Sequence, residues 1–74
     1  MRKSTEELIE IRLDEAPLRL GAGTTLATLL EQLGRNPMAV ATAHNGQFIP
    51  RDARHHTVLR QGDQVLLFSA ITGG

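Results

Sequence analysis

The last ten residues of the chain limit its possible folds more than any other segment. An unbroken apolar run, Val65–Phe68, follows the turn residues Gln61-Gly62-Asp63. Such a run is typical of a strand at the centre of a sheet, with both faces covered. The chain then ends at Gly73-Gly74, which have no side chains to pack and the largest backbone freedom. We therefore expect a central strand that continues into an extended tail.

A tail of this kind can pass through a channel that is too narrow for side chains. Extended at about 3.3 Å per residue, the segment Ser69–Gly74 would reach about 20 Å. Its terminal carboxylate could then be delivered into the active site of another protein. The two glycines alone fit a frayed end or an expression scar equally well, so they leave both interpretations open.

Composition excludes several classes of function. The chain has 74 residues, which corresponds to one domain. It has no cysteine, which excludes disulfides, thiolate zinc sites and a cysteine nucleophile. Eight basic residues balance eight acidic ones, and the only aromatic residues among Phe, Trp and Tyr are Phe48 and Phe68. With no basic field and no stacking platform, we expect no nucleic-acid partner.

The sequence also indicates where in the cell the protein is expected. No apolar run is long enough to span a bilayer, and the first residues do not form a signal-peptide pattern. We therefore expect no membrane partner and a cytoplasmic location.

The first half of the chain predicts a β-hairpin and a helix. Apolar residues alternate with polar ones from Leu8 to Leu13, and again around Leu18 and Leu20, with Asp14-Glu15-Ala16 as the turn and Pro17 at the start of the second strand. Four leucines then recur at helical spacing, with Thr24 or Thr25 as N-cap and Gly34 as the C′ residue: Leu26, Leu29, Leu30 and Leu33. We interpret this leucine face as core rather than as a partner-binding face, because the hairpin needs cover.

The second half predicts a short hairpin before the final strand. Asn45-Gly46 favours a type I′ turn between a strand over residues 40–44 and a short edge strand, Gln47–Ile49, that ends at Pro50. The sequence does not decide which side of residues 40–44 is buried, because small residues occupy both. Arg51–His56 is expected to be a polar loop or a single helical turn, and Thr57–Leu59 returns to the core.

This order of elements predicts an α+β fold of the β-grasp (ubiquitin-like) type, with a mixed sheet of four or five strands and one main helix across one face. The first and last strands are expected to lie side by side in parallel. We expect the domain to span residues 8–70, with a flexible leader over residues 1–7 and a flexible tail over residues 71–74.

The alternation of side chains assigns two faces to the final strand. Val65 and Leu67 should point to the helix, while Leu66, Phe68 and Ala70 should point away from it. We favour a contact patch on this second face, because a chain this short has little left to cover it. The alternative is that a loop covers it.

The remaining polar residues give weak signals. His44, His55 and His56 lack the spacing of a metal site, so we expect no metal. Asp52 and Asp63 fit turn or cap positions better than catalytic ones. Three arginines near the histidines are compatible either with a mildly basic rim that faces an acidic partner or with an ordinary surface: Arg51, Arg54 and Arg60.

Several of these segments together resemble the ThiS family, the small sulfur carriers of thiamine biosynthesis. The resemblance covers about residues 8–74 and is carried by the hairpin, the helix start, Asn45–Arg51, Gly62–Val65 and the terminal Gly73-Gly74. Related molybdopterin-synthase small subunits usually carry prolines shortly before the glycines, where this chain has Ser69–Thr72. The departures from the family pattern are the leader over residues 1–7 and His44, at a position where a small aliphatic residue is usual.

The resemblance implies a carrier with no catalytic residues and no bound cofactor. In the family, an E1-like partner that uses ATP and Mg²⁺ adenylates the terminal carboxylate. Sulfur from a sulfurtransferase or cysteine desulfurase then forms a thiocarboxylate, which thiazole synthase consumes. Gly74 would bear the reactive carbon, and Gly73 would allow close approach to the partner. The partner-binding residues would be Leu66, Phe68, Ala70, Ile71 and Thr72.

Two alternatives stay open on the sequence. One is the molybdopterin branch of the same carriers, which would form a complex with a large catalytic subunit. The other belongs to a different class, a ubiquitin-like binding or conjugation module whose tail is joined to lysines.

Overall fold

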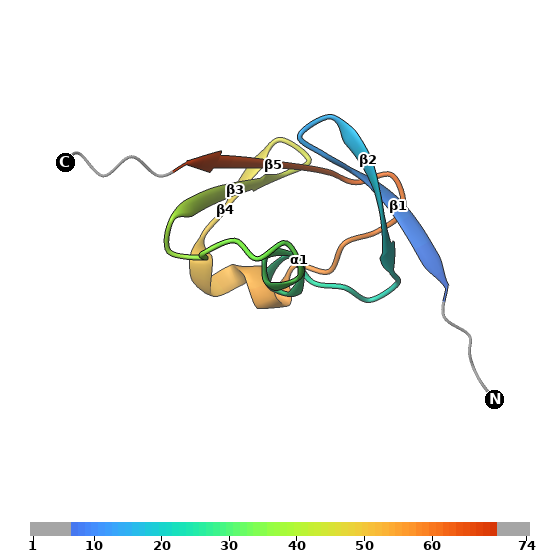
Figure 1. The fold of residues 1–74 in the computed structure, drawn as a ribbon, viewed down its shortest axis with the longest axis horizontal. Coiled ribbons are helices and arrows are strands. Elements are labelled where there is room, and N and C mark those ends of the chain that lie inside the picture. The colour runs from blue at the N-terminus through green and yellow to red at the C-terminus, as the bar shows by residue number, and fades with distance from the viewer. Residues whose placement is uncertain (1–6, 70–74) are drawn as a thin grey trace.

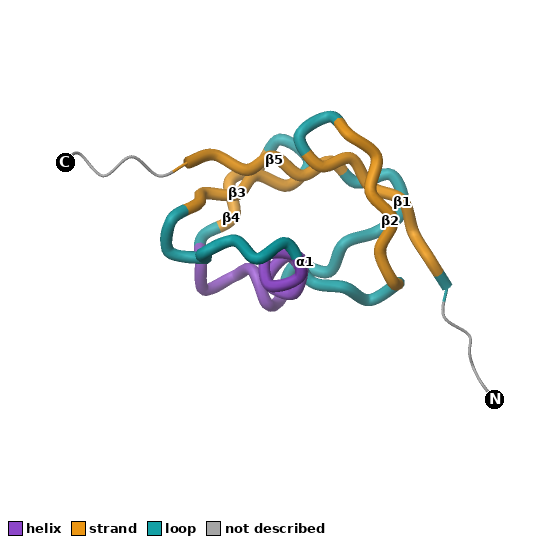
Figure 2. Tube along the Cα trace, in the orientation of Figure 1, coloured by secondary structure: helices purple, strands orange, loops and turns teal. Residues whose placement is uncertain are grey.

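The computed structural model describes residues 7–69 and shows one mixed sheet with one α-helix across one face (Figures 1 and 2). The strand order is β2-β1-β5-β3-β4, so that the last strand lies at the centre of the sheet. It pairs in parallel with β1 and antiparallel with β3. Along the chain the elements are β1 (Leu8–Leu13), β2 (Ala16–Gly21), α1 (Leu26–Gln32), β3 (Val40–His44), β4 (Gln47–Ile49), the 3₁₀ helix η1 (Arg51–His56) and β5 (Gln64–Ser69).

The first hairpin forms as predicted, but its turn is one residue shorter. Leu13 pairs with Ala16, which makes Ala16 the first residue of β2 and leaves only Asp14 and Glu15 in the loop. Both loop residues have positive φ values, 50° and 72°. A two-residue turn with positive φ at both positions matches the right-handed twist of the strands, although neither residue is glycine.

Helix α1 begins and ends at the expected signals. Thr25 is the N-cap, and its hydroxyl accepts a hydrogen bond from the Thr28 N–H at 3.1 Å. At the other end Gly34 adopts a φ of +72°, the left-handed conformation that suits a residue just after a helix. Leu33 caps the helix instead of belonging to it and is 36% exposed. The other three leucines of the predicted face are buried, as expected for core residues.

The second hairpin settles the side of β3 that the sequence left open. Asn45 and Gly46 form the turn with φ values of 51° and 84°, and β4 lies at the edge of the sheet. Val40 and Thr42 are buried, and the Thr42 hydroxyl donates to the Ile49 carbonyl at 3.0 Å. The alanines of β3 therefore face the opposite side of the sheet, because side chains alternate along a strand.

The core lies between α1 and the sheet. Its buried residues come from both ends of the chain and from the segment between η1 and β5: Ile11, Leu20, Leu26, Leu29, Leu59 and Val65. The predicted parity of β5 is confirmed, since Val65 is fully buried and Leu67 packs against this cluster. Phe68, on the other face, is 52% exposed. The expectation that both faces of β5 would be covered is therefore wrong among residues 7–69, because the α-helix covers one face only.

In the described part of the chain, no helix has the length and apolar character needed to cross a bilayer.

Replacing Leu29 by alanine tests the position of the core. Leu29 is 1% exposed, and removing such a buried side chain lowers the free energy of unfolding by about 2–5 kcal/mol. A core of this size supplies about 3–5 kcal/mol, so Leu29→Ala should be largely unfolded. Urea unfolding followed by circular dichroism measures the loss.

Leu33→Ala is the matched control, because it removes the same side chain from a partly exposed position just after the helix. It should lower the free energy of unfolding by less than about 1 kcal/mol. Equal losses in the two variants would contradict the burial pattern of α1.

Candidate functional site

The sequence analysis predicts that the reactive C-terminal segment follows directly after β5. Strand β5 reaches the end of the molecule opposite to the start of β1, as Figure 1 shows. The predicted reactive residues Gly73 and Gly74 lie outside the described residues, as do the predicted contact residues Ala70, Ile71 and Thr72. The structure therefore bears on the strand that carries this segment and on the surface around it.

Leu66 and Phe68 belong to a larger apolar surface on the side of the sheet away from α1. Strand pairing places Ala43 opposite both Leu66 and Phe48, and Ala41 opposite Phe68. Residues that pair directly across neighbouring strands share a face. We call this set the apolar outer face; its members are Ala41, Ala43, Phe48, Leu66 and Phe68.

Phe48 is the member of this face that the sequence analysis missed. It is 64% exposed, more than Phe68. The Asn45-Gly46 turn was a usable signal, because a two-residue turn makes Phe48 the partner of Ala43. The sequence did not decide on which side of the sheet Ala43 lies, however, so the side of Phe48 stayed undecided as well.

A polar cluster fixes the start of β5. The Asp63 carboxylate lies 2.6 Å from His44 Nε2 and accepts hydrogen bonds from Asn45 Nδ2 at 3.1 Å and the Arg60 N–H at 2.9 Å. The Asn45 side chain in turn accepts from the Gln64 N–H at 2.8 Å. His44, which departs from the family pattern, therefore occupies a largely buried position as a hydrogen-bond partner of Asp63. Asp63 is a turn residue, as expected, that also ties β3 to β5.

The same contacts set the charge state of Asp63. Partial burial acts to raise the pKa of this carboxyl, but the hydrogen bonds from His44, Arg60 and Asn45 outweigh it and hold the pKa below its usual value. The folded protein therefore favours the carboxylate over the protonated acid.

A second carboxylate contacts β5 from the first hairpin. Strand β1 pairs with β5 only at Arg12–Gln64 and Leu13–Val65. Beyond these pairs, Asp14 Oδ1 accepts a hydrogen bond from the Leu67 N–H at 3.1 Å. A side chain thus replaces the backbone of β1 as the hydrogen-bond partner of β5 at this position.

Arg54 does not lie on a basic rim, which is where one interpretation of the sequence placed it. It is only 3% exposed, and its guanidinium donates to the Thr42 hydroxyl, the Pro37 carbonyl and the Val40 carbonyl. Burial lowers the pKa of Arg54, and the charge of nearby Arg51 lowers it further. Arg54 therefore holds η1 against β3 and the loop before it.

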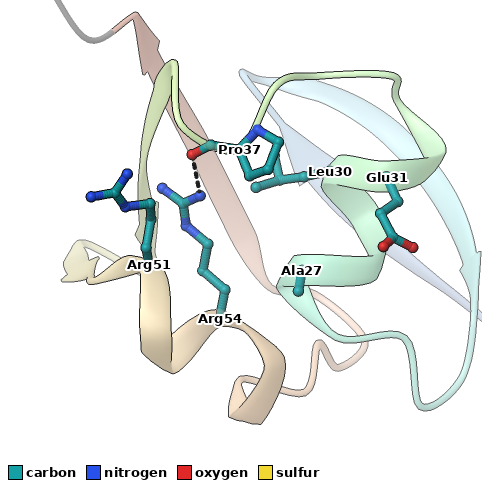
Figure 3. Close-up of a pocket in the computed structure, with 6 residues that line it drawn as sticks. All are labelled: Ala27, Leu30, Glu31, Pro37, Arg51 and Arg54. Carbon is teal, nitrogen blue, oxygen red and sulfur yellow. Dashed lines mark hydrogen bonds between the residues drawn. The ribbon is translucent and has the colours of Figure 1, made fainter.

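Arg51 and Arg54 line two hollows on this side of the molecule. Figure 3 shows the first, a cleft of about 260 Å³ between α1 and η1, where the Arg54 head points to the Pro37 carbonyl; its lining residues are Ala27, Leu30, Glu31, Pro37, Arg51 and Arg54. The second is a groove of about 350 Å³ beside the edge of the sheet, lined by Met38, Val40, Ala41, Phe48, Pro50, Arg51 and Arg54. Ala41 and Phe48 belong to the apolar outer face, so the groove adjoins that face.

The histidines do not come together. His55 and His56 lie in η1 with ring centroids 4.0 Å apart, whereas His44 contacts Asp63. No group of three potential metal ligands occurs within residues 7–69. The described residues thus offer an exposed apolar surface and a central strand whose start is held by hydrogen bonds.

Asp63→Asn tests the polar cluster at the start of β5. Because folding lowers the pKa of Asp63, its carboxylate stabilises the protein above the unfolded pKa, and this stability is lost as pH falls through the folded pKa. At neutral pH the substitution should lower the free energy of unfolding by about 1–3 kcal/mol. The difference from wild type should shrink below about pH 5, as the wild-type carboxylate becomes protonated.

Urea unfolding at a series of pH values measures this difference. Asp52→Asn is the control, since Asp52 is exposed and its side chain forms no hydrogen bond with the residues described. A gap between wild type and Asp63→Asn that stayed constant down to pH 3 would contradict the assigned role of the carboxylate.

Comparisons with known proteins agree with this geometry. The model of the ThiS family matches residues 5–74. The sulfur carrier protein ThiS of Escherichia coli K12 is 36% identical over 66 residues, which cover 89% of this chain and all of that protein. The crystal structure of the thiamine biosynthesis protein ThiS from Geobacter metallireducens has a TM-score of 0.79 at 22% identity, over 89% of this chain and all of that one. That structural likeness confirms the β-grasp fold, and the match to the family model over nearly the whole sequence shows that the chain belongs to the ThiS family.

Proposed function

We propose that this protein is a sulfur carrier of thiamine biosynthesis and that Gly74 carries the sulfur. The observation that carries the proposal is the family match, which extends to the terminal Gly73-Gly74. The E. coli relative is named a sulfur carrier protein and is matched over its full length. The protein acts as a co-substrate, and its own contribution is the position of its C-terminus rather than an acid, a base or a metal.

The chemistry explains why a carrier of this kind needs an activating partner. A carboxylate is a poor electrophile, because its carbonyl carbon has no good leaving group. An E1-like enzyme with ATP and Mg²⁺ would join the Gly74 carboxylate to AMP and release pyrophosphate. A persulfide sulfur from a sulfurtransferase or cysteine desulfurase would then displace AMP and form an acyl disulfide. Attack of a thiol on the S–S bond would release the Gly74 thiocarboxylate for thiazole synthase and leave that thiol in a new disulfide. We propose a cytoplasmic location for this reaction, because the activating step consumes ATP.

The described residues support this role by holding β5 at its start. The Asp63 cluster and the pairing with β1 hold the start of the strand, and the pairing with β3 continues to Ser69. A partner that recognises the body of the protein therefore meets the C-terminal segment at a defined place, which reduces the entropy cost of bringing its carboxylate to the reaction.

The apolar outer face is the surface on which we place the partners. Phe48 and Phe68 are both more than half exposed and come from neighbouring parts of one sheet face. Exposed aromatic side chains of this kind are enriched at the centres of protein interfaces. The face is continuous with the strand that leads to Ala70, Ile71 and Thr72, which we propose as further contact residues.

Incubation with the adenylating enzyme of thiamine synthesis, ATP, Mg²⁺ and a sulfur donor tests the proposed function. The intact mass should rise by the difference between one sulfur and one oxygen, and fragmentation should place the change at Gly74. Removal of Gly74 should abolish this product without changing the unfolding temperature, because the last described strand, β5, ends at Ser69.

Three results would contradict the proposal. An isopeptide bond between Gly74 and a lysine would make the protein a conjugation module. Activation only by the molybdopterin-type enzyme would assign it to that pathway. Sulfur transfer to the variant that lacks Gly74 would show that the acceptor lies elsewhere.

Phe68→Asp tests the apolar outer face. Because Phe68 is half exposed and lies opposite the core, the substitution should lower the free energy of unfolding by less than about 1 kcal/mol. Placing a charge at the centre of an interface should raise the KM of the activating enzyme for the carrier about tenfold or more. Steady-state kinetics and thermal unfolding provide the two measurements.

Leu8→Asp is the matched control, because Leu8 is 63% exposed but lies at the start of β1, at the other end of the molecule (Figure 1). It should leave the KM unchanged. A large loss of stability in Phe68→Asp, or equal effects of both variants on KM, would contradict the assignment of the docking face.

A further inference from the structure

Arg51 and Arg54 form a pair of positive charges that the described part of the protein leaves without a counter-ion. The ion pairs found within residues 7–69 are Arg19–Glu10 and His44–Asp63, and neither includes these two arginines. Both arginines line the same cleft and the same groove, and Figure 3 shows their guanidinium groups at the same level of the cleft. Two like charges this close repel each other, and an anion beside them would relieve that repulsion.

The hydrogen bonds of the two side chains are also incomplete. A guanidinium has five N–H donors, and Arg54 uses three of them on neutral oxygens of Thr42, Val40 and Pro37. Arg51 is exposed, and its side-chain contact within the described residues is Met38 Sδ, 2.8 Å from Nη1. A thioether is a weak acceptor, whereas a carboxylate accepts two parallel hydrogen bonds from a guanidinium.

The groove beside these arginines suits an anion better than the cleft does. Its charged lining residues are Arg51 and Arg54, and the other lining residues, such as Met38 and Pro50, are apolar. The cleft contains the same two arginines together with Glu31, whose carboxylate would repel an entering anion. The groove, of about 350 Å³, is at the lower end of the range for ligand pockets, about 300–1,000 Å³. This size suits one or two inserted side chains.

The position of the groove identifies the class of its occupant. Ala41 and Phe48 line the groove and also belong to the apolar outer face, so a protein docked on that face extends directly over the groove. We propose that an aspartate or glutamate side chain of the partner protein that docks on the apolar outer face enters this groove and pairs with Arg51, beside Arg54. The identity of that partner rests on the proposed function; the ability of the groove to accept a carboxylate does not.

Kinetics with the activating enzyme test the first part of the proposal. Arg51→Gln should raise the KM for the carrier about tenfold and leave kcat unchanged, because Arg51 contributes to docking and not to the reaction at Gly74. Arg51→Lys, which keeps the charge but loses the two parallel hydrogen bonds, should give an intermediate KM. The difference between Arg51→Gln and wild type should shrink as salt is added.

Arg19→Gln is the control, because it removes the same charge from β2 at the opposite edge of the sheet. The KM of the activating enzyme for Arg19→Gln should equal its KM for the wild-type carrier. Thermal unfolding of Arg51→Gln should match wild type, since Arg51 is exposed. A KM for Arg51→Gln equal to that of Arg19→Gln overturns the proposal.

An NMR titration tests the groove without any partner. In the nitrogen-15-labelled full chain, acetate should shift the side-chain N–H signals of Arg51 and Arg54 saturably, and chloride at equal ionic strength should not. Equal shifts with acetate and chloride overturn the proposal. Tight saturation by inorganic phosphate, together with an unchanged KM in Arg51→Gln, would make the groove a site for a small free anion and overturn it as well.

The two tests separate failure of this inference from failure of the proposed function. If the wild-type chain is not activated at all, the proposed function is wrong, and the acetate titration alone decides whether the groove accepts a carboxylate. If the wild-type chain is activated and the KM for Arg51→Gln equals that for wild type, the proposed function is supported and the proposed role of the groove is wrong.

Discussion

The position of β5 between β1 and β3 is the constraint on which the rest of the structure depends. β1 comes from the start of the described chain and pairs in parallel with β5, while β3 pairs with β5 in the antiparallel sense from Val65 to Ser69. Val65 is fully buried at the junction of the two pairings. Because these contacts join segments far apart in the sequence, forming the central strand costs loop-closure entropy that the rest of the core has to offset. The segment that follows β5 therefore leaves from a strand that the whole domain holds.

The two faces of β5 have separate tasks. The face with Val65 and Leu67 packs against the helix and supplies stability, whereas the face with Leu66 and Phe68 lies outside the core and is the face that we propose for contact with other proteins. The alternation of side chains along a strand allows both tasks in six residues. The proposed docking surface is therefore built from residues that do not belong to the core. The buried guanidinium of Arg54 contributes to the fold and also to the surface. It joins η1 to β3 through hydrogen bonds, and it lines the groove that adjoins the apolar outer face.

Local sequence patterns predicted the elements whose signals lie within a few residues. The alternation in β1 and β5, the leucine spacing of α1 and the Asn45-Gly46 turn all act over short distances, and the structure confirms them. The N-cap was predicted as Thr24 or Thr25, and the structure selects Thr25. The outward direction of Leu66 and Phe68 followed from the same alternation. The two-residue turn at Asp14 and Glu15 was not predicted in length, because glutamate, unlike glycine or asparagine, is not a usual signal for positive φ.

Features that depend on distant partners could not be predicted from local patterns. The burial of Arg54 depends on carbonyl groups of Pro37 and Val40, which a polar stretch around Arg54 does not indicate. His44 fits a nearly buried position only because Asp63 lies beside it, 19 residues later in the chain. Phe48 joins the apolar outer face through its pairing with Ala43, whose side was undecided in a strand of small residues. In each case the tertiary contact, and not the residue type, determines the environment.

The early end of β1 has a mechanical consequence for β5. After Leu13 the first hairpin turns away, and only the Asp14 carboxylate follows the central strand as far as Leu67. The last residues of β5 therefore pair with one neighbouring strand only, β3. Their amide hydrogens should exchange with solvent faster than those near Val65. Separating Ser69 from Val40 breaks few contacts, and each residue released from β5 adds about 3.3 Å of extended backbone outside the sheet. The pairs between the end of β5 and β3 are therefore the part of the central sheet that opens most easily, while Val65 stays paired on both sides.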